Sequence, residues 1–360
     1  MGIRIKSRPL TSHGRYLSLL GTKSLADLEE SIVARVLDCV RALPRAQFPP
    51  VKLSKVVNNF DIEPIPRFDP SIPDGRLHFD STQNRFLITL GRELRRSCGY
   101  NTADLFDPEA GVTQDRLLTR RLRFTYAHEV AHRFCYFEEN GHWSRALRAA
   151  TANRGPALTD RRRLELNEEQ LCNRVAGRLL VPRDLLVEYI HQRLSSNSDL
   201  SVLDFQKEIR SAANLFEVSE DCLLVQLQRA AERDQLTLPS NLCAFSLRLS
   251  DRSGASQRAA RTLRIQIALL PSCVDGVQLC RIFPGLAARH LGPAFSSWLC
   301  DLRKSGNKTR SGQLNVPITL HTNSDRPSSQ LFTLSGWWKN NRTDTNSVLL
   351  WGFLGQYKNK

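Results

Sequence analysis

Two histidines lie four residues apart in the stretch FTYAHEVAHRF, and a glutamate directly follows the first. Residues at this spacing share one face of a helix, so His128 and His132 can each direct an imidazole nitrogen at a common metal ion. Glu129 then suits the role of general base toward water at the open side of that ion. A match to this pattern arises by chance in roughly one such chain in a hundred, so the surrounding sequence has to decide.

A catalytic zinc takes three protein ligands and one water, so a third donor must come from elsewhere in the chain. In one known arrangement the donor is a histidine six residues after the second, but Glu138 occupies that position. His142 matches no ligand spacing, and we expect it in a loop. Glu168 and Glu169 precede the apolar face of the next predicted helix, and either carboxylate can complete a site with two histidines and one glutamate.

These segments resemble the ImmA/IrrE family of intracellular metallopeptidases. RFTYAHEVAHRF is similar to the family's Arg-Phe-Thr-x-Ala-His-Glu-x-x-His helix, and EEQLCNRVAGRLLVP is similar to its Glu-x-x-Ala-Asn-x-Phe-Ala-x-x-Leu-Leu-x-Pro helix. Cys172 stands where the family pattern has alanine, and Val175 stands where it has phenylalanine. The resemblance covers roughly residues 25–235.

The resemblance implies which residues carry the chemistry. His128 and His132 become metal ligands, Glu129 becomes the catalytic base, and Glu169, four residues before an asparagine, becomes the third ligand, with Glu168 as the alternative. One catalytic Zn²⁺ is expected, with Mn²⁺ as a possible substitute. Candidates for a transition-state donor rest on residue type alone, and they are Tyr126, His142, Tyr189 and His191.

The resemblance also implies an activity, that of a zinc-dependent endopeptidase in transcription regulation or stress response that cleaves a protein such as a DNA-bound repressor. Two alternatives stay open. The first is a non-catalytic regulator that keeps the zinc fold and binds nucleic acid or protein. The second is a zinc hydrolase that acts on a non-peptide amide. An intact Glu129 argues against a purely structural site.

The whole chain is typical of a folded protein without a membrane segment. Of its 360 residues, 41% are hydrophobic and 24% are charged, and no apolar run approaches the roughly 18 to 20 residues of a membrane helix. The start of the sequence lacks the apolar core of a signal peptide, so we expect a cytoplasmic location. The nine cysteines form no Cys-x-x-Cys pair, which favours reduced, mostly buried thiols.

Charge is concentrated in the last third of the chain. Residues 241–360 carry 16 Lys and Arg against 5 Asp and Glu, a balance of +11 within a total of +15. Such a block can attract nucleic acid through its phosphates, although solvated surface charge explains it equally well.

Apolar residues at helical spacing predict helices over residues 24–43, 113–137, 164–180, 183–193, 202–215 and 219–233. The run RFLITLG predicts a short strand, and runs such as CAFSLRLS and LRIQIALL predict a β-containing region beyond about residue 237. We therefore expect an α+β protein in three parts. These are an N-terminal arm (1–23), a mainly helical zincin-like domain with a short sheet and a helical tail (24–236), and a separate basic α+β accessory or sensor-like domain (237–360).

Overall fold

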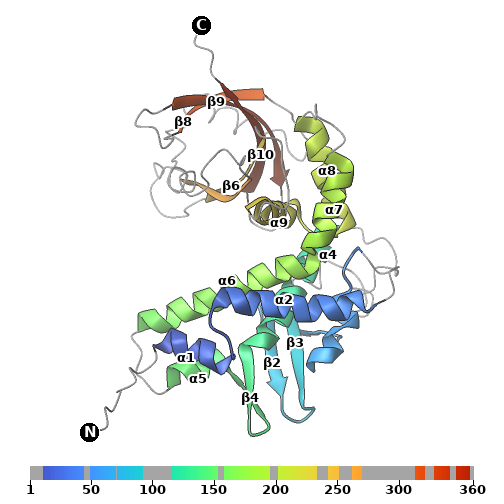
Figure 1. The fold of residues 1–360 in the computed structure, drawn as a ribbon, viewed down its shortest axis with the longest axis vertical. Helices are drawn as coiled ribbons and strands as arrows, with labels where there is room; N and C mark the ends of the chain where they lie inside the picture. Colours follow the sequence, from blue (N-terminus) through green and yellow to red (C-terminus); the bar gives the residue numbers. More distant parts are fainter. Residues whose placement is uncertain are drawn as a thin grey trace, which may run out of the picture. The chain divides into compact units, whose positions relative to one another are not determined.

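The computed structural model describes the following residues: 11–43, 49–69, 71–91, 116–152, 158–194, 202–232, 242–250, 262–269, 313–320, 328–340 and 346–356. The chain divides into two compact units (Figure 1). One comprises Met1–Pro182 with Ala213–Ser219, and the other comprises Arg183–Ala212 with Glu220–Lys360. Both units combine helices with sheets, which confirms the α+β class.

The first unit contains every residue that the sequence marks as a metal ligand. Its helices are α1 (Ser12–Leu19), α2 (Leu25–Arg41), α4 (Arg116–His132), α5 (Ala146–Ala152) and α6 (Leu158–Leu180), with short 3₁₀ segments η2 (Leu53–Lys55), η3 (Val57–Phe60) and η4 (Arg133–Cys135). Its strands are β1 (Arg67–Asp69), β2 (Gly75–Asp80), β3 (Arg85–Gly91), β4 (Tyr136–Glu139) and β5 (His142–Arg145).

Helix α2 forms where its cap and its apolar spacing predict it. The Ser24 side chain accepts a hydrogen bond of 3.0 Å from the Asp27 N–H, which satisfies one of the free donors at the helix start. Ile32, Val36 and Val40 are buried on the face that packs against α6. Residues 12–19, within the expected N-terminal arm, form helix α1, which packs against α5.

A three-stranded sheet supports α4 from one side. Its strand order is β1-β3-β2, with β3 in the centre and buried from Phe86 onward, as the apolar run RFLITLG predicts. Strand β2 pairs antiparallel with β3 and lies at an edge of this sheet among the described strands. Helix α4 packs against β2, β3 and α6 and therefore lies between the sheet and the second ligand-bearing helix (Figure 1).

Helix α4 ends at His132, five residues before the predicted end at Phe137. The chain instead forms a hairpin of β4 and β5, in which Glu139 pairs with His142. Asn140 and Gly141 make the turn with φ values of 53° and 78°, the left-handed conformation that two-residue hairpin turns require. The prediction that helix continues to Phe137 was thus wrong, and His142 begins a strand instead of lying in a loop.

Aromatic packing holds this hairpin against the sheet. The Phe86 ring on β3 contacts the rings of Tyr136 and Trp143, with centroid distances of 5.1 and 5.5 Å. The Arg133 guanidinium lies 3.8 Å from the Trp143 ring centroid and 4.3 Å from that of Phe86, so it packs against both rings. The burial of these groups favours the hairpin over a continued helix.

The second unit contains helices α7 (Arg183–Leu194), α8 (Val202–Leu215), whose last turn belongs to the first unit, and α9 (Glu220–Glu232). All three agree with the predicted helices. Its sheet has the order β7-β6-β10-β9-β8, with every neighbouring pair antiparallel. The strands are β6 (Leu242–Ser250), β7 (Thr262–Leu269), β8 (Gln313–Leu320), β9 (Ser328–Asn340) and β10 (Asn346–Gln356).

The compact units and the predicted domains divide the chain at different places. We predicted a boundary at residues 236 and 237, whereas the compact units group α7 and α9 with the C-terminal strands, and α9 packs against β7. Among the described residues, no helix combines the length and apolar character that crossing a membrane requires.

Candidate metal centre

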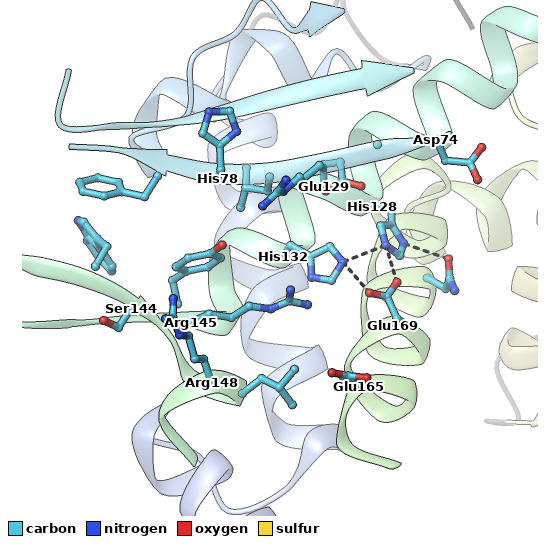
Figure 2. Close-up of a pocket in the computed structure, with 18 of the residues that line it drawn as sticks. Asp74, His78, His128, Glu129, His132, Ser144, Arg145, Arg148, Glu165 and Glu169 are labelled. Atoms are coloured by element: carbon cyan, nitrogen blue, oxygen red, sulfur yellow. Dashed lines mark hydrogen bonds and ion pairs between the residues drawn. The ribbon is translucent and has the colours of Figure 1, made fainter. Parts of the chain in front are cut away.

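Three predicted ligands converge on one point between α4 and α6 (Figure 2). The Nε2 atoms of His128 and His132 lie 3.0 Å apart. One carboxylate oxygen of Glu169 lies 3.1 Å from the His128 nitrogen, and the other lies 3.4 Å from the His132 nitrogen. The structure therefore brings together the two histidines and the glutamate that the family resemblance singles out.

These separations fit a single tetrahedral ion. With metal–ligand bonds of about 2.0–2.1 Å, two ligand atoms on one tetrahedral zinc lie about 3.3 Å apart. The three observed separations fall on both sides of this value, and two imidazoles with one carboxylate form a common ligand set of catalytic zinc. The residues thus fit a zinc ion both in chemistry and in spacing.

Hydrogen bonds on the far side of each ring fix which nitrogen faces the ion. His128 Nδ1 lies 3.0 Å from Oδ1 of Asn173, and His132 Nδ1 lies 3.3 Å from Oε1 of Glu168. Both oxygens accept hydrogen bonds, so each neutral ring carries its proton on Nδ1. The Nε2 lone pairs are then free to point at the ion, as in other metal sites with oriented histidines.

Glu168, the alternative ligand, lies behind the His132 ring instead of beside the ion. Its side chain is 0% exposed, and its Oε1 accepts hydrogen bonds of 2.9 and 2.6 Å from Nε and Nη2 of Arg145. Burial alone would raise the Glu168 pKa, but its interactions with His132 and Arg145 outweigh burial and lower it. Glu168 is therefore a charged partner of His132 and does not lie on the ligand side.

Charge interactions also shape the ligands in the metal-free protein. Hydrogen bonds from His128 and His132 lower the Glu169 pKa far below its usual range. Burial opposes a charge on His132, but hydrogen bonds with Cys135, Glu168 and Glu169 together raise its pKa well above the ordinary value. Without an ion, a positive His132 thus lies beside the negative Glu169.

Glu129 lies between this centre and the edge strand β2. Its side chain is 5% exposed, and this burial raises its pKa, which makes the carboxylate a stronger base. The Leu77 backbone N–H partly offsets this rise in the pKa. Gly75 makes this close approach possible, because a Cβ atom at that position would lie 2.7 Å from Oε1 of Glu129.

The ligands and Glu129 line one open cleft of about 1510 Å³. Strand β2 and helix α4 form one wall, while β5, α5 and the first half of α6 form the other. His78, Ser144, Arg145, Arg148 and Glu165 contribute polar side chains (Figure 2). The cleft is large enough for several residues of an extended peptide.

The four residues proposed by type as transition-state donors do not line this cleft. Tyr126 is buried and donates a 3.0 Å hydrogen bond to the Pro64 carbonyl. His142 is exposed at the end of the hairpin, and Tyr189 and His191 lie on α7 in the other compact unit. Tyr126 and His142 therefore lack the position that the role requires.

Sequence reasoning missed Arg145 and the part played by Asn173. Arg145 ends strand β5 and reaches Glu168 across the cleft wall, and only the hairpin puts it there. The Asn-Gly pair at residues 140 and 141 is a strong hairpin signal and could have located the strand. Asn173 stands in the family pattern, and its position four residues after Glu169 could have suggested a role beside the ligands.

Comparison with known proteins adds little to the site. No family model matches the chain, and no curated protein matches it. A solved structure described as a Mycobacterium tuberculosis transcriptional regulator aligns over 96% of this chain and 95% of that chain, with 11% identity and a TM-score of 0.41. A likeness this low carries no argument about fold or function.

Proposed function

We propose that this protein is a zinc-dependent endopeptidase with a zincin-like catalytic domain. The observation that carries the proposal is the convergence of His128 Nε2, His132 Nε2 and the Glu169 carboxylate, at separations of 3.0, 3.1 and 3.4 Å. The resemblance to the ImmA/IrrE family supports the same assignment, with the same three ligands.

Glu129 acts as the general base. His128, His132 and Glu169 would hold a zinc ion, which would supply a Lewis acid able to polarise a carbonyl and to lower the pKa of water to about 7. The Glu129 carboxylate takes the proton of the attacking water and passes it to the leaving amine. Its burial favours this role, because a raised pKa brings the carboxylate closer to the working pH.

The edge strand β2 favours a peptide over a non-peptide amide. The Gly91 N–H donates to the Asp74 carbonyl, so Asp74 pairs with β3, and Leu77, three residues further on, directs its backbone groups away from β3. Because strand residues alternate, Gly75 and Phe79 present their backbone groups to the same side. All three residues line the cleft, so an extended substrate can pair with β2 as an added strand while its carbonyl reaches the ion.

The proposed substrate is a regulatory protein such as a DNA-bound repressor. This step rests on the family resemblance, and the basic balance of residues 241–360 is consistent with attraction to DNA. The side chains of that region lie outside the described residues, so the nucleic-acid role stays a prediction.

The decisive experiment compares metal content and cleavage in matched variants of the full chain. Wild type, Glu129→Gln, His128→Ala and Glu139→Gln are purified, assayed for zinc, and expressed in cells whose proteins are then compared for new cleavage products. Glu139 is an exposed residue of β4 outside the cleft and serves as the control. We expect Glu129→Gln to keep zinc and lose cleavage, His128→Ala to lose both, and Glu139→Gln to keep both.

Each alternative function gives a different result. A non-catalytic regulator binds zinc in wild type and in Glu129→Gln but yields no product in either. A hydrolase of non-peptide amides loses activity on small amides in Glu129→Gln without any change in cellular proteins. Full proteolysis by Glu129→Gln would remove the general-base assignment.

A further inference from the structure

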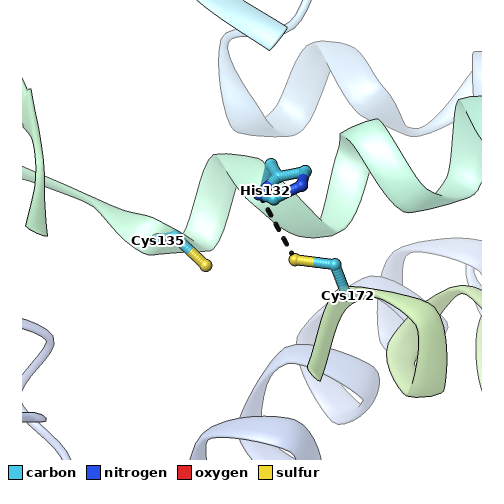
Figure 3. A group of neighbouring side chains, drawn as sticks. All are labelled: His132, Cys135 and Cys172. Atoms are coloured by element: carbon cyan, nitrogen blue, oxygen red, sulfur yellow. Dashed lines mark hydrogen bonds between the residues drawn. The ribbon is translucent and has the colours of Figure 1, made fainter. Parts of the chain in front are cut away.

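A second cluster of metal-binding atoms lies behind His132 (Figure 3). It consists of the His132 Nδ1 atom and the sulfur atoms of Cys135 in η4 and Cys172 on α6, which all lie within 4.8 Å of one another. The Cys172 sulfur is 3.4 Å from His132 Nδ1. Both cysteines are free thiols and are 0% exposed.

Two buried polar atoms next to this cluster lack a hydrogen bond. The Tyr16 hydroxyl is buried beside Cys135 and Glu168 and interacts with both, but it makes no well-formed hydrogen bond among the described residues. The same holds for Oε2 of Glu168, whose other oxygen binds Arg145. Buried polar groups are normally satisfied, so two such atoms around one thiol pair point to a missing charged group.

A cation bound by thiolate sulfur would give both atoms a partner. The Tyr16 hydroxyl can donate to an anionic Cys135 sulfur, which forms when a metal displaces the thiol proton. The negative Glu168 carboxylate interacts favourably with a nearby positive ion.

We propose that His132 Nδ1, Cys135 and Cys172 form an inner site for monovalent copper. Two thiolates and one imidazole are the soft donors that Cu(I) prefers, and the surrounding side chains are buried. Among the described residues this group offers two sulfur atoms and one nitrogen, one donor fewer than the four that a structural zinc takes. The three-donor set therefore favours Cu(I) over Zn²⁺.

The spacing of the donors agrees with one shared ion. With bonds of about 2.0 Å to nitrogen and about 2.3 Å to sulfur, the two ligand atoms lie roughly 3.5–3.8 Å apart. The observed 3.4 Å between His132 Nδ1 and the Cys172 sulfur is close to this range. Binding displaces both thiol protons and the Nδ1 proton of His132 to solvent and adds one positive charge, so the site gains two net negative charges.

Occupation of the inner site changes the proposed zinc centre. Cu(I) takes the Nδ1 lone pair of His132 and thereby replaces the proton that Glu168 accepts. The hydrogen bond that orients the ring is then lost, so we expect Cu(I) to weaken zinc binding at Nε2 of the same ring. The inner site is a second metal site and does not depend on peptidase activity.

An anaerobic Cu(I) titration of the metal-free full chain tests the site, with a coloured Cu(I) chelator as competitor. Wild type is compared with Cys135→Ala and Cys172→Ala, and Cys39→Ser on α2 is the control because Cys39 lies outside the cluster. We expect each alanine variant to lose one equivalent of tightly bound Cu(I) that the control variant keeps. X-ray absorption should show one nitrogen and two sulfur neighbours for the copper bound by wild type and lost from the variants.

Two results would overturn the proposal. One is an equal number of tightly bound Cu(I) ions in all four proteins, which would mean that the two cysteines are ordinary core residues. The other is a copper environment without a nitrogen neighbour. Circular dichroism shows whether each variant folds, and Cys172→Ala alone decides the matter if Cys135→Ala does not fold. Because the readout is copper binding, failure here leaves the proposed peptidase function untouched.

Discussion

Oε1 of Glu168 lies 3.3 Å from Nδ1 of His132, inside a helix pair where the carboxylate has no exposed surface. A charged acceptor in this position fixes the ring and makes its other nitrogen a stronger metal ligand.

Glu168→Gln is therefore expected to weaken zinc binding about 10- to 100-fold, because the charge behind His132 is lost and Arg145 loses its ionic partner. Competition with a zinc-binding dye measures the affinity. Glu139→Gln is the control and should match wild type. An unchanged affinity in Glu168→Gln would show that this carboxylate does not act on the ligand.

Gly75→Ala should impair the general base Glu129 without affecting metal binding. The new Cβ atom would lie 2.7 Å from Oε1 of Glu129 and 2.8 Å from Cγ2 of Thr125, so the glutamate has to move. We expect unchanged zinc content and a loss of kcat on the order of 100-fold, the effect of displacing a reacting group by about 1 Å. Steady-state kinetics together with metal analysis checks this, and wild-type kcat in the variant would contradict the position assigned to Glu129.

Glu129→Gln should stabilise the metal-free protein at neutral pH. Burial raises the folded-state pKa of Glu129 above its unfolded value of about 4.3. The folded state therefore binds more protons in the window between these two pKa values, and wild-type stability falls as pH rises through it.

Because Gln has no charge to bury, Glu129→Gln should be more stable than wild type at pH 7, and this difference in stability should disappear near pH 4. Thermal unfolding of the metal-free proteins at both pH values measures the difference, with Glu139→Gln as the exposed control. An equal advantage at both pH values would show that the ionisation of Glu129 is not the cause.

Removal of zinc should lower the unfolding temperature of wild type. A ligand that binds only the folded state at 100 times its Kd stabilises that state by about 2.7 kcal/mol. Calorimetry with and without a chelator measures the shift, and His128→Ala should show none. A shift of equal size in that variant would mean that the chelator acts at another site.

The helices of the first unit follow from local signals. Ser24 caps α2, and apolar spacing sets its buried face, so both could be predicted without knowledge of the fold. The spacing of His128 and His132 likewise predicts their shared face, and the structure confirms that face. These features depend on residues within one or two turns of each other.

The choice between Glu168 and Glu169 depends on contacts that local patterns do not contain. Consecutive residues on a helix point about 100° apart, so one carboxylate reaches the ion position while the other is buried behind the ring. Only the packing of α4 on α6 decides which of the two carboxylates reaches the ion position. In the sequence, the choice of Glu169 rested on the family pattern. Arg145 could not be predicted either, because its contact with Glu168 depends on where the hairpin ends.

The hairpin of β4 and β5 and helix α5 lie between the second histidine and the glutamate along the chain, and they form one wall of the cleft. A cation bound by both His132 and Glu169 would cross-link the two ends of this segment, which are 37 residues apart. Loss of this cation would then remove the Lewis acid and release one wall of the cleft at the same time. For the proposed peptidase, we therefore expect loss of the metal to weaken substrate binding as well as cleavage.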